Sequence, residues 1–287
     1  MAFEEHRRML FGIAYRMLGS VADAEDMVQD TWLRWSEVTV PVTNPAGYLA
    51  RTVTNLALNR LGSAAVRREA YVGPWLPEPL VTVPDSTREA ETAESVSLAV
   101  LVVLESLSPL ERAVFVLKEV FAFSYREIAE VLERSEASVR QVGHRARSHV
   151  RSGQPRYDAP AELRRRVTDE FLAACVGGDL NRMLELLAPS VTVWSDGGGR
   201  VKAALRPIEG ADKVARFLLA ILASLPSAEL EILPVDVNGQ PGLLVNTAGR
   251  TDSVTVFEFE DGRVSELRIV RNPEKLRHLG AGGPGQL

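Results

Sequence analysis

Two arginine-rich stretches without acidic residues are the parts of the chain best suited to chemistry, and that chemistry is contact with phosphate. Between Val38 and Arg68 there is no acidic residue, and the stretch holds four arginines. Between Ala137 and Arg151 acid is again absent, while four arginines and two histidines crowd together. Guanidinium groups bind phosphate oxygens, and this binding releases counterions from nucleic acid. Two separate parts of the chain are therefore predicted to face DNA.

The second stretch follows a clear helix start and a short break. Ser124-Tyr125-Arg126-Glu127 has the spacing of a capping box, and Arg134-Ser135 interrupts the helix before another begins at about Glu136. A short helix, a tight turn and a longer basic helix form a helix-turn-helix, whose second helix lies in the major groove. The side chains predicted to reach base edges are Glu136, Ser138, Val139, Arg140 and Gln141, with His144, Arg145 and Arg147 a turn further on, suited to phosphates. The alternative is a basic helix face that only meets solvent.

An acidic stripe characterises an earlier helix. After Ser20, apolar residues recur at helical spacing from Ala24 to Trp35, and Asp23, Asp26 and Asp30 fall on the opposite side. This stripe would repel DNA, so the spacing indicates either a solvated face or a surface that docks on a protein.

Signals for catalysis are weak. Asp196 and Asp252 are candidate pocket acids, but Asp196 precedes three glycines and is more readily explained as a turn residue. No phosphate-binding Gly-Lys-Ser/Thr loop occurs. The single cysteine, Cys175, lies in an apolar helical pattern and is expected to be a buried thiol, which excludes a disulfide within the chain and a Cys-based zinc site. We therefore expect no catalytic residue, no metal and no cofactor.

The amino-acid composition limits the classes of protein to which the chain can belong. The chain has 287 residues, of which 46% are hydrophobic and 25% charged, values typical of a globular protein with two or three domains. No apolar run approaches the roughly 20 residues that span a bilayer, and no targeting segment is recognisable, so a cytoplasmic protein without membrane contact is expected. The net charge of -5 argues against a free-standing DNA-binding protein.

Periodicity divides the chain into five parts. Residues 1–66 are predicted to be helical, 67–91 to be a proline-rich linker, 92–153 to hold the helix-turn-helix, 154–278 to form an α+β domain, and 279–287 to be a flexible tail. Within the α+β domain we expect helices at about 161–176, 180–187 and 211–223, and strands at 191–194, 201–205, 229–237, 243–246, 254–259 and 264–270. The linker carries Tyr71, Trp75 and Leu76, and because an inert tether would be polar, these apolar side chains are expected to dock on another surface.

The helical segments resemble the extracytoplasmic-function (ECF) sigma factors of bacterial RNA polymerase. The resemblance rests on Asp23–Trp32 in sigma region two, and on Leu107–Arg112, Ser124–Glu130 and Arg145–Arg147 in sigma region four. It implies binding of core polymerase at the beta-prime clamp helices and the beta flap, and recognition of promoter DNA.

The resemblance also assigns residues to these roles. Docking on the clamp helices falls to Asp23, Asp26, Gln29 and Asp30. Recognition and opening of the downstream promoter element falls to Tyr48, Arg51, Asn55, Asn59 and Arg60, by stacking, hydrogen bonding to a flipped base and phosphate contact. The upstream element falls to the helix-turn-helix residues named above. A core position is the alternative for Tyr48.

The C-terminal part resembles the SnoaL-like, ketosteroid-isomerase-like fold, a cone-shaped α+β domain. Three marks are similar to those of the SigJ-like subgroup of sigma factors, which carries this domain fused to the sigma regions: Tyr71–Pro79, Asp196–Gly199 and Asn272–Leu276. The resemblance implies a multidomain chain of two all-α sigma domains and this regulatory domain, which modulates sigma activity and has room for an unidentified small ligand. The expected regulatory contacts are Tyr71, Trp75, Leu76, Asp196, Asn272, Pro273, Lys275 and Leu276.

Two other classes of function stay open at this point. A ligand-binding enzyme with an accessory DNA module would turn over a small polycyclic substrate without polymerase. A free-standing regulator would bind duplex DNA without polymerase, against which the acidic net charge speaks.

Overall fold

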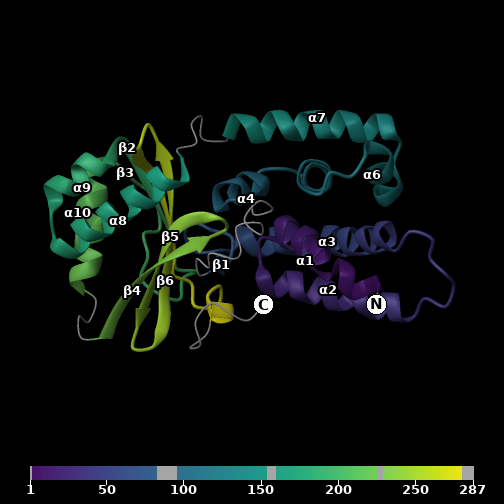
Figure 1. Cartoon of the computed structure of the whole chain (residues 1–287), viewed down its shortest axis with the longest axis horizontal. Coiled ribbons are helices and arrows are strands. Elements are labelled where there is room, and N and C mark those ends of the chain that lie inside the picture. The colour runs from purple at the N-terminus through teal and green to yellow at the C-terminus, as the bar shows by residue number, and fades with distance from the viewer. Residues whose placement is uncertain (1, 83–95, 154–159, 225–228, 280–287) are drawn as a thin grey trace. The chain divides into compact units, whose positions relative to one another are not determined.

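The computed structural model describes residues 2–82, 96–153, 160–224 and 229–279 (Figure 1). The chain divides into two compact units, Met1–Ala70 with Val100–Gln154, and Tyr71–Ala99 with Pro155–Leu287. The segment after Ala70, which the sequence predicts to be a linker with docking apolar side chains, is thus grouped with the C-terminal unit. Residues 83–91 of the predicted linker and 280–287 of the predicted tail lie outside the described residues.

The first unit begins with three helices, α1 (Ala2–Leu18), α2 (Val21–Ser36) and α3 (Pro45–Glu69). The Ser20 side chain accepts a hydrogen bond from the Asp23 backbone N–H at 3.2 Å and so caps α2, as its position predicts. Fully buried side chains from α1 and α3 fill the space between the helices. Each contributes about 1.5–3 kcal/mol relative to an exposed position. Burial of the apolar stripe therefore leaves the acidic stripe of α2 on the outside.

The same unit resumes at Val100, within α4 (Leu98–Glu105), and continues with α5 (Pro109–Phe115), a π-helical turn η2 (Val116–Val120), α6 (Tyr125–Leu132) and α7 (Glu136–Gly153). The predicted capping box of Ser124 with Glu127 forms, and a second capping box joins Ser108 and Glu111. Helix α6 ends at Glu133 in the left-handed conformation, with φ of 53°, which turns the chain into α7.

A buried arginine joins the α1–α3 bundle to the helices that follow it. The Arg112 guanidinium donates to the Met17 carbonyl oxygen at 2.7 Å and pairs with the Glu105 carboxylate at 3.0 Å. Burial lowers the pKa of Arg112 to about 10. Because a buried charge is tolerated only with partners, this contact fixes α5 against the end of α1.

A seven-stranded sheet forms the centre of the second unit. Its strands are β1 (Val81–Thr82), β2 (Leu187–Asp196), β3 (Ile208–Glu209), β4 (Leu230–Val237), β5 (Gln240–Thr247), β6 (Arg250–Glu260) and β7 (Arg263–Val270). The spatial order is β1-β4-β5-β6-β7-β2-β3, and only the β2–β7 pair is parallel. Asp261 and Gly262 both have positive φ in the predicted hairpin turn between β6 and β7.

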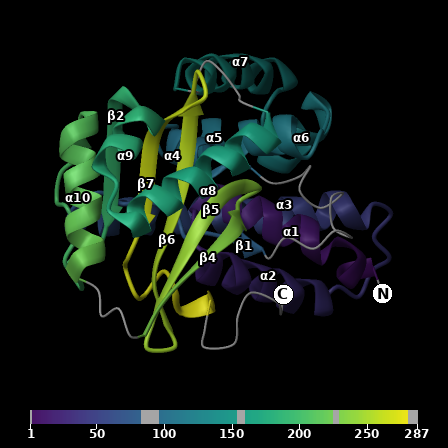
Figure 2. The same ribbon diagram turned by 60° about the vertical axis from the view of Figure 1, so that its left-hand side comes forward.

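Three helices pack on the sheet, α8 (Ala161–Gly177), α9 (Leu180–Leu186) and α10 (Ala211–Ser224), and Figure 2 shows α8 crossing its face. A short 3-10 helix, η4 (Arg277–Leu279), follows the last strand. The core between helices and sheet includes Phe171 and Phe257, whose ring centroids lie 5.6 Å apart. Cys175 is buried there as predicted, and burial raises the pKa of its thiol to about 12. No helix among the described residues could span a membrane.

Two expectations about strands differ from the structure. The predicted strand at 201–205 is irregular, and the strand that pairs with β2 is β3, further along the chain. Strand β1 was not expected, since it lies within the proline-rich linker and pairs with β4, Val81 opposite Val237. Strands β1 and β3 are both two-residue strands at the edges of the sheet. The formation of such short strands depends more on their pairing partners than on their own sequence.

Candidate functional sites: polymerase face, DNA faces and linker clamp

The acidic face of α2 is only partly free. Asp26, Gln29 and Asp30 are exposed. Asp23 instead receives the guanidinium of Arg60 on α3, with Nε 3.0 Å from a carboxylate oxygen, and this bond raises the pKa of Arg60. Asp23, predicted to dock on polymerase, and Arg60, predicted to contact promoter DNA, thus hold α2 and α3 together. The other three predicted docking residues face outward.

An apolar component of this face is absent from the predicted docking set. Trp32 and Leu33 are nearly half exposed at the end of α2. Trp32 also lines a groove between α1 and α2, together with Phe3, Glu4, Arg7, Glu25, Asp26, Val28 and Gln29. A large exposed apolar residue beside an acidic one is typical of a protein contact, and its place in the Asp23–Trp32 motif was the available signal.

The predicted downstream-element residues lie along α3 but do not form one open face. Tyr48 is partly buried, and its ring centroid lies 5.7 Å from that of Trp35. Arg51 is exposed and forms an ion pair with Glu133 at the end of α6. Tyr48 and Arg51 also line a groove against α6, with Asn44, Gly47, Phe123, Glu127, Glu130 and Val131. Asn59 is exposed and Asn55 is partly buried on the same helix.

The recognition helix α7 exposes most of its predicted reading residues. Arg140, Gln141, His144 and Arg145 are exposed, while Glu136, Ser138 and Arg147 are partly exposed. Val139 has no exposed surface, because it packs in the core of the helix-turn-helix, and its predicted contact with DNA is therefore wrong.

The cations of α7 meet acids of their own chain. Glu136 pairs with Arg140 one turn along the helix. Arg145 lies 3.5 Å from Glu111. Arg147 lies 3.1 Å from Glu119 and donates to the Tyr125 hydroxyl at 2.6 Å. These three arginines are therefore already paired with glutamates of the same unit.

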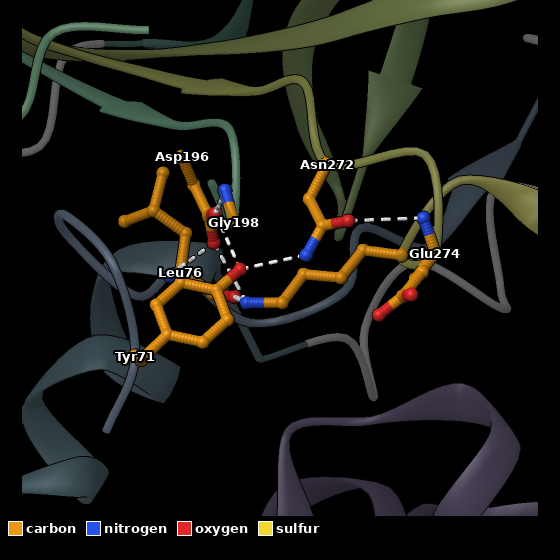
Figure 3. A network of polar contacts seen from close by, with 7 residues as sticks. Tyr71, Leu76, Asp196, Gly198, Asn272 and Glu274 are labelled. Atoms are coloured by element: carbon orange, nitrogen blue, oxygen red, sulfur yellow. Dashed lines mark hydrogen bonds and ion pairs between the residues drawn. The ribbon is translucent and has the colours of Figure 1, made fainter. Parts of the chain in front are cut away.

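Asp196 anchors the linker within the C-terminal unit (Figure 3). Asp196 is 1% exposed, and its carboxylate accepts hydrogen bonds from the Tyr71 hydroxyl at 2.6 Å and the Leu76 backbone N–H at 2.8 Å. It also accepts from the Gly198 N–H at 3.1 Å, which is the turn contact that the three glycines suggested. Burial, together with the hydrogen bond to Asp196, raises the pKa of Tyr71.

Lys275 supplies the charge that balances Asp196. Its ammonium lies 2.7 Å from the Asp196 carboxylate, donates to the Leu76 carbonyl, and sits 4.0 Å from the ring centroid of Trp75. Asn272 donates to the Tyr71 hydroxyl at 2.7 Å. We call this group, Asp196, Asn272 and Lys275 around Tyr71 and Leu76, the linker clamp.

The remaining regulatory residues support the clamp differently. Leu276 is buried, whereas the Pro273 side chain is exposed and only its carbonyl accepts a turn hydrogen bond from the Leu276 N–H, at 3.4 Å. Sequence reasoning missed Asn238, which exchanges hydrogen bonds with Leu80, and His278, whose ring lies 2.8 Å from the Pro79 carbonyl oxygen. The β-branched run that begins two residues after Pro79 is the sequence signal for this edge pairing.

The acids considered for catalysis are engaged elsewhere. Asp252 pairs with Arg271 at 3.0 Å, and Asp196 belongs to the linker clamp. A buried group that the sequence did not suggest contains Arg268 between Glu258, at 3.2 Å, and Glu266, at 2.8 Å. Burial raises the pKa of Glu258 to about 7, outweighing the attraction of Arg268. Among the described residues no cluster of three His, Cys, Asp or Glu could hold a metal.

Comparison with known families matches three parts of the chain. Residues 2–67 match the family Sigma-70 region 2, residues 97–150 match Sigma-70, region 4, and residues 168–267 match the SnoaL-like domain.

Whole proteins and a solved structure agree with these matches. The chain is 39% identical to the ECF RNA polymerase sigma factor SigJ of Mycobacterium tuberculosis, over 96% of this chain and 92% of that protein. It is 32% identical to the probable ECF RNA polymerase sigma factor SigI of the same organism, over 98% and 95%. The crystal structure of M. tuberculosis SigJ superposes with a TM-score of 0.77 at 35% identity and covers 99% of both chains. The chain therefore belongs to the extracytoplasmic-function sigma factors of RNA polymerase, in the subgroup that carries a fused C-terminal SnoaL-like domain.

Proposed function

We propose that this sigma factor binds core polymerase through the outer face of α2, reads promoter DNA through α3 and α7, and is restrained by its own C-terminal domain through the linker clamp. Family membership makes it a transcription regulator that acts with RNA polymerase in the cytoplasm, and not an enzyme. The observation that carries the restraint is the buried Asp196–Lys275 pair, which holds the connector between regions two and four.

The restraint follows from the reach of the connector. Upstream and downstream promoter elements are separate sites on DNA, so both regions bind at once only if the connector allows their spacing. Residues 71–82, fully extended, would span at most about 43 Å. While the clamp holds them on the C-terminal domain, this length cannot contribute to the reach, and release of the clamp restores it.

Polymerase docking is proposed for Asp26, Gln29 and Asp30, with Trp32 as an apolar anchor. Asp26→Lys should weaken capture of core polymerase, because it reverses charge at the centre of the acidic face. Glu5→Lys makes the same change at an exposed position of α1 and should leave capture intact. Equal capture by both variants would contradict the proposed docking face.

Promoter reading is proposed for Arg140 and Gln141, with His144, Arg145 and Arg147 near phosphates, and for Tyr48, Arg51, Asn55 and Asn59 at the downstream element. Arg140→Ala should lose discrimination at one or two positions, costing about 1–3 kcal/mol for a bidentate contact. An equal loss on all sequences would make Arg140 a phosphate contact. A small ligand of the C-terminal domain stays a prediction.

The restraint is tested by run-off transcription with core polymerase, on DNA that the holoenzyme itself selects from a randomised pool. A chain ending at Arg271 keeps β7 but loses Asn272 and Lys275, and it should transcribe more strongly because the linker is released. A chain ending at Leu279 keeps the clamp and serves as the control. Equal transcription by the two chains would contradict the restraint, while failure of the full chain to bind core polymerase would contradict the sigma function itself.

A further inference from the structure

Tyr125, the first residue of α6, lies where three cations of region four converge. The Arg140 guanidinium carbon lies 5.1 Å from its ring centroid, and the Lys118 ammonium lies 5.0 Å from the same centroid. Its hydroxyl accepts a hydrogen bond from Arg147 at 2.6 Å. Both arginines belong to the recognition helix, whereas Tyr125 belongs to the helix before it.

A glycine in the middle of α7 makes room for this ring. A Cβ at Gly143 would stand 3.1 Å from Tyr125 Cε1 and 3.3 Å from its hydroxyl, closer than ordinary van der Waals contact. Glycine is a weak helix former, so its presence inside a helix calls for a packing reason. The close approach of the Tyr125 ring to α7 supplies that reason.

The ring limits the conformations of Arg140. Arginine has a long side chain that loses much rotamer freedom on binding, and bidentate contact with guanine requires its planar fork to be presented in one orientation. The Arg140 guanidinium lies against the Tyr125 ring and also forms an ion pair with Glu136. A side chain already oriented before DNA arrives loses less entropy on binding.

We infer that Tyr125 is a positioning residue for promoter recognition. Its ring orients Arg140 toward base edges, and its hydroxyl holds Arg147 in place for contact with the DNA phosphate backbone. The inference rests on the proposed reading role of Arg140. It assigns a part in sequence specificity to a side chain of the first helix of the motif, and separates the role of its ring from the role of its hydroxyl.

The test uses holoenzyme assembled from the full chain and core polymerase. A pool of DNA duplexes with a randomised upstream element is selected by binding and sequenced, which gives the base preference at each position. Arg140→Ala identifies the positions that depend on Arg140, because their preference flattens. Tyr125→Leu removes ring and hydroxyl, and Tyr125→Phe removes the hydroxyl alone.

We expect Tyr125→Leu to lower discrimination by about two- to fivefold at the positions identified with Arg140→Ala, and to leave the other positions unchanged, as the loss of an exposed cation–ring contact predicts. Tyr125→Phe should keep the preference at those positions and weaken binding to all sequences alike, since only the Arg147 contact is lost. Gly143→Ala should move the ring and reproduce part of the Tyr125→Leu effect. Arg126→Ala, at an exposed neighbour of Tyr125, should keep the preference.

The outcomes separate the inference from the function on which it rests. Thermal unfolding and capture of core polymerase check that each variant is folded. If Tyr125→Leu does not fold, Gly143→Ala provides the test. Base preferences in Tyr125→Leu or Gly143→Ala equal to those of the parent would overturn the inference alone. A parental holoenzyme that selects no sequence, or an Arg140→Ala variant that loses no position, would overturn the proposed reading role and the inference with it.

Discussion

Replacing Lys275 by methionine should release the linker, because the Asp196 carboxylate then remains buried without its cation. The Lys275 and Asp196 side chains are 8% and 0% exposed, and their charged atoms lie 2.7 Å apart. Methionine has nearly the length of lysine, so the cavity stays filled while the charge and the hydrogen bond to the Leu76 carbonyl are lost. The change therefore isolates the electrostatic part of the linker clamp.

The magnitude follows from the burial of the pair. Removing one partner of a buried ion pair costs about 3–5 kcal/mol, which is between about a hundredfold and a few thousandfold in an equilibrium constant. Asp196 keeps its donors from Tyr71, Leu76 and Gly198, so the effect should fall at the lower end. The equilibrium affected is undocking of the linker, since Leu76 stays bonded only while the linker is docked.

Hydrogen exchange of the Leu76 amide measures this equilibrium, because its N–H donates to Asp196 at 2.8 Å in a buried position. Exchange should be about a hundredfold faster in Lys275→Met. The control is Glu274→Gln, which breaks the exposed pair with Arg200, 3.0 Å long, and should change exchange by no more than about fivefold, since such pairs contribute at most about 1 kcal/mol. Adding Asp196→Asn to Lys275→Met should recover part of the protection. Exchange in Lys275→Met within the range of the control would refute the clamp.

Three further changes have defined outcomes. Gly198→Ala should lower the thermal unfolding midpoint more than Gly249→Ala. Both glycines have positive φ, but only at Gly198 would a new Cβ overlap a neighbouring side-chain amide. Equal losses in the two variants would contradict this account. Glu258 has a pKa raised from 4.5 to about 7, so its contribution to stability, about 3 kcal/mol, is complete below pH 4.5 and is lost as the pH rises through 7. Glu258→Gln should remove this decline from hydrogen exchange of β6 and β7, and an unchanged profile would contradict it. Arg51→Ala should lower the free energy of unfolding, measured in urea, by less than about 1 kcal/mol, because its ion pair with Glu133 is exposed, and a loss of several kcal/mol would contradict this estimate.

Local signals in the sequence predict much of the fold. The caps at Ser20, Ser108 and Ser124 form where their spacing places them, because a cap depends only on residues within one turn. The helices and the longer strands of the C-terminal unit follow from periodicity for the same reason. The π-helical turn Val116–Val120 departs from this rule, since its apolar pattern also suits a continuous α-helix and tertiary packing decides between the two.

The sites depend more on tertiary contacts, and here prediction from sequence reaches less far. The three marks at Tyr71, Asp196 and Asn272–Leu276 identify the segments of the linker clamp, but their meeting at one carboxylate is a property of the folded sheet. The helical spacing of Val139 does not reveal that it faces inward, because the buried side of a short helix is set by its partner helix. Neither does spacing reveal that Asp23 binds Arg60.

The structure also gives a reason for the acidic net charge of a chain that reads DNA. Each of Arg51, Arg140, Arg145 and Arg147 has a glutamate of its own unit within ion-pair distance. If these arginines contact DNA as proposed, DNA must displace the glutamates, so we expect a smaller gain from counterion release and weak binding by the sigma factor alone. On the proposed roles of α3 and α7, we expect core polymerase to offset this cost by raising the local concentration of promoter DNA at these helices. Intramolecular pairing thus favours promoter reading within the holoenzyme over indiscriminate binding by the free chain.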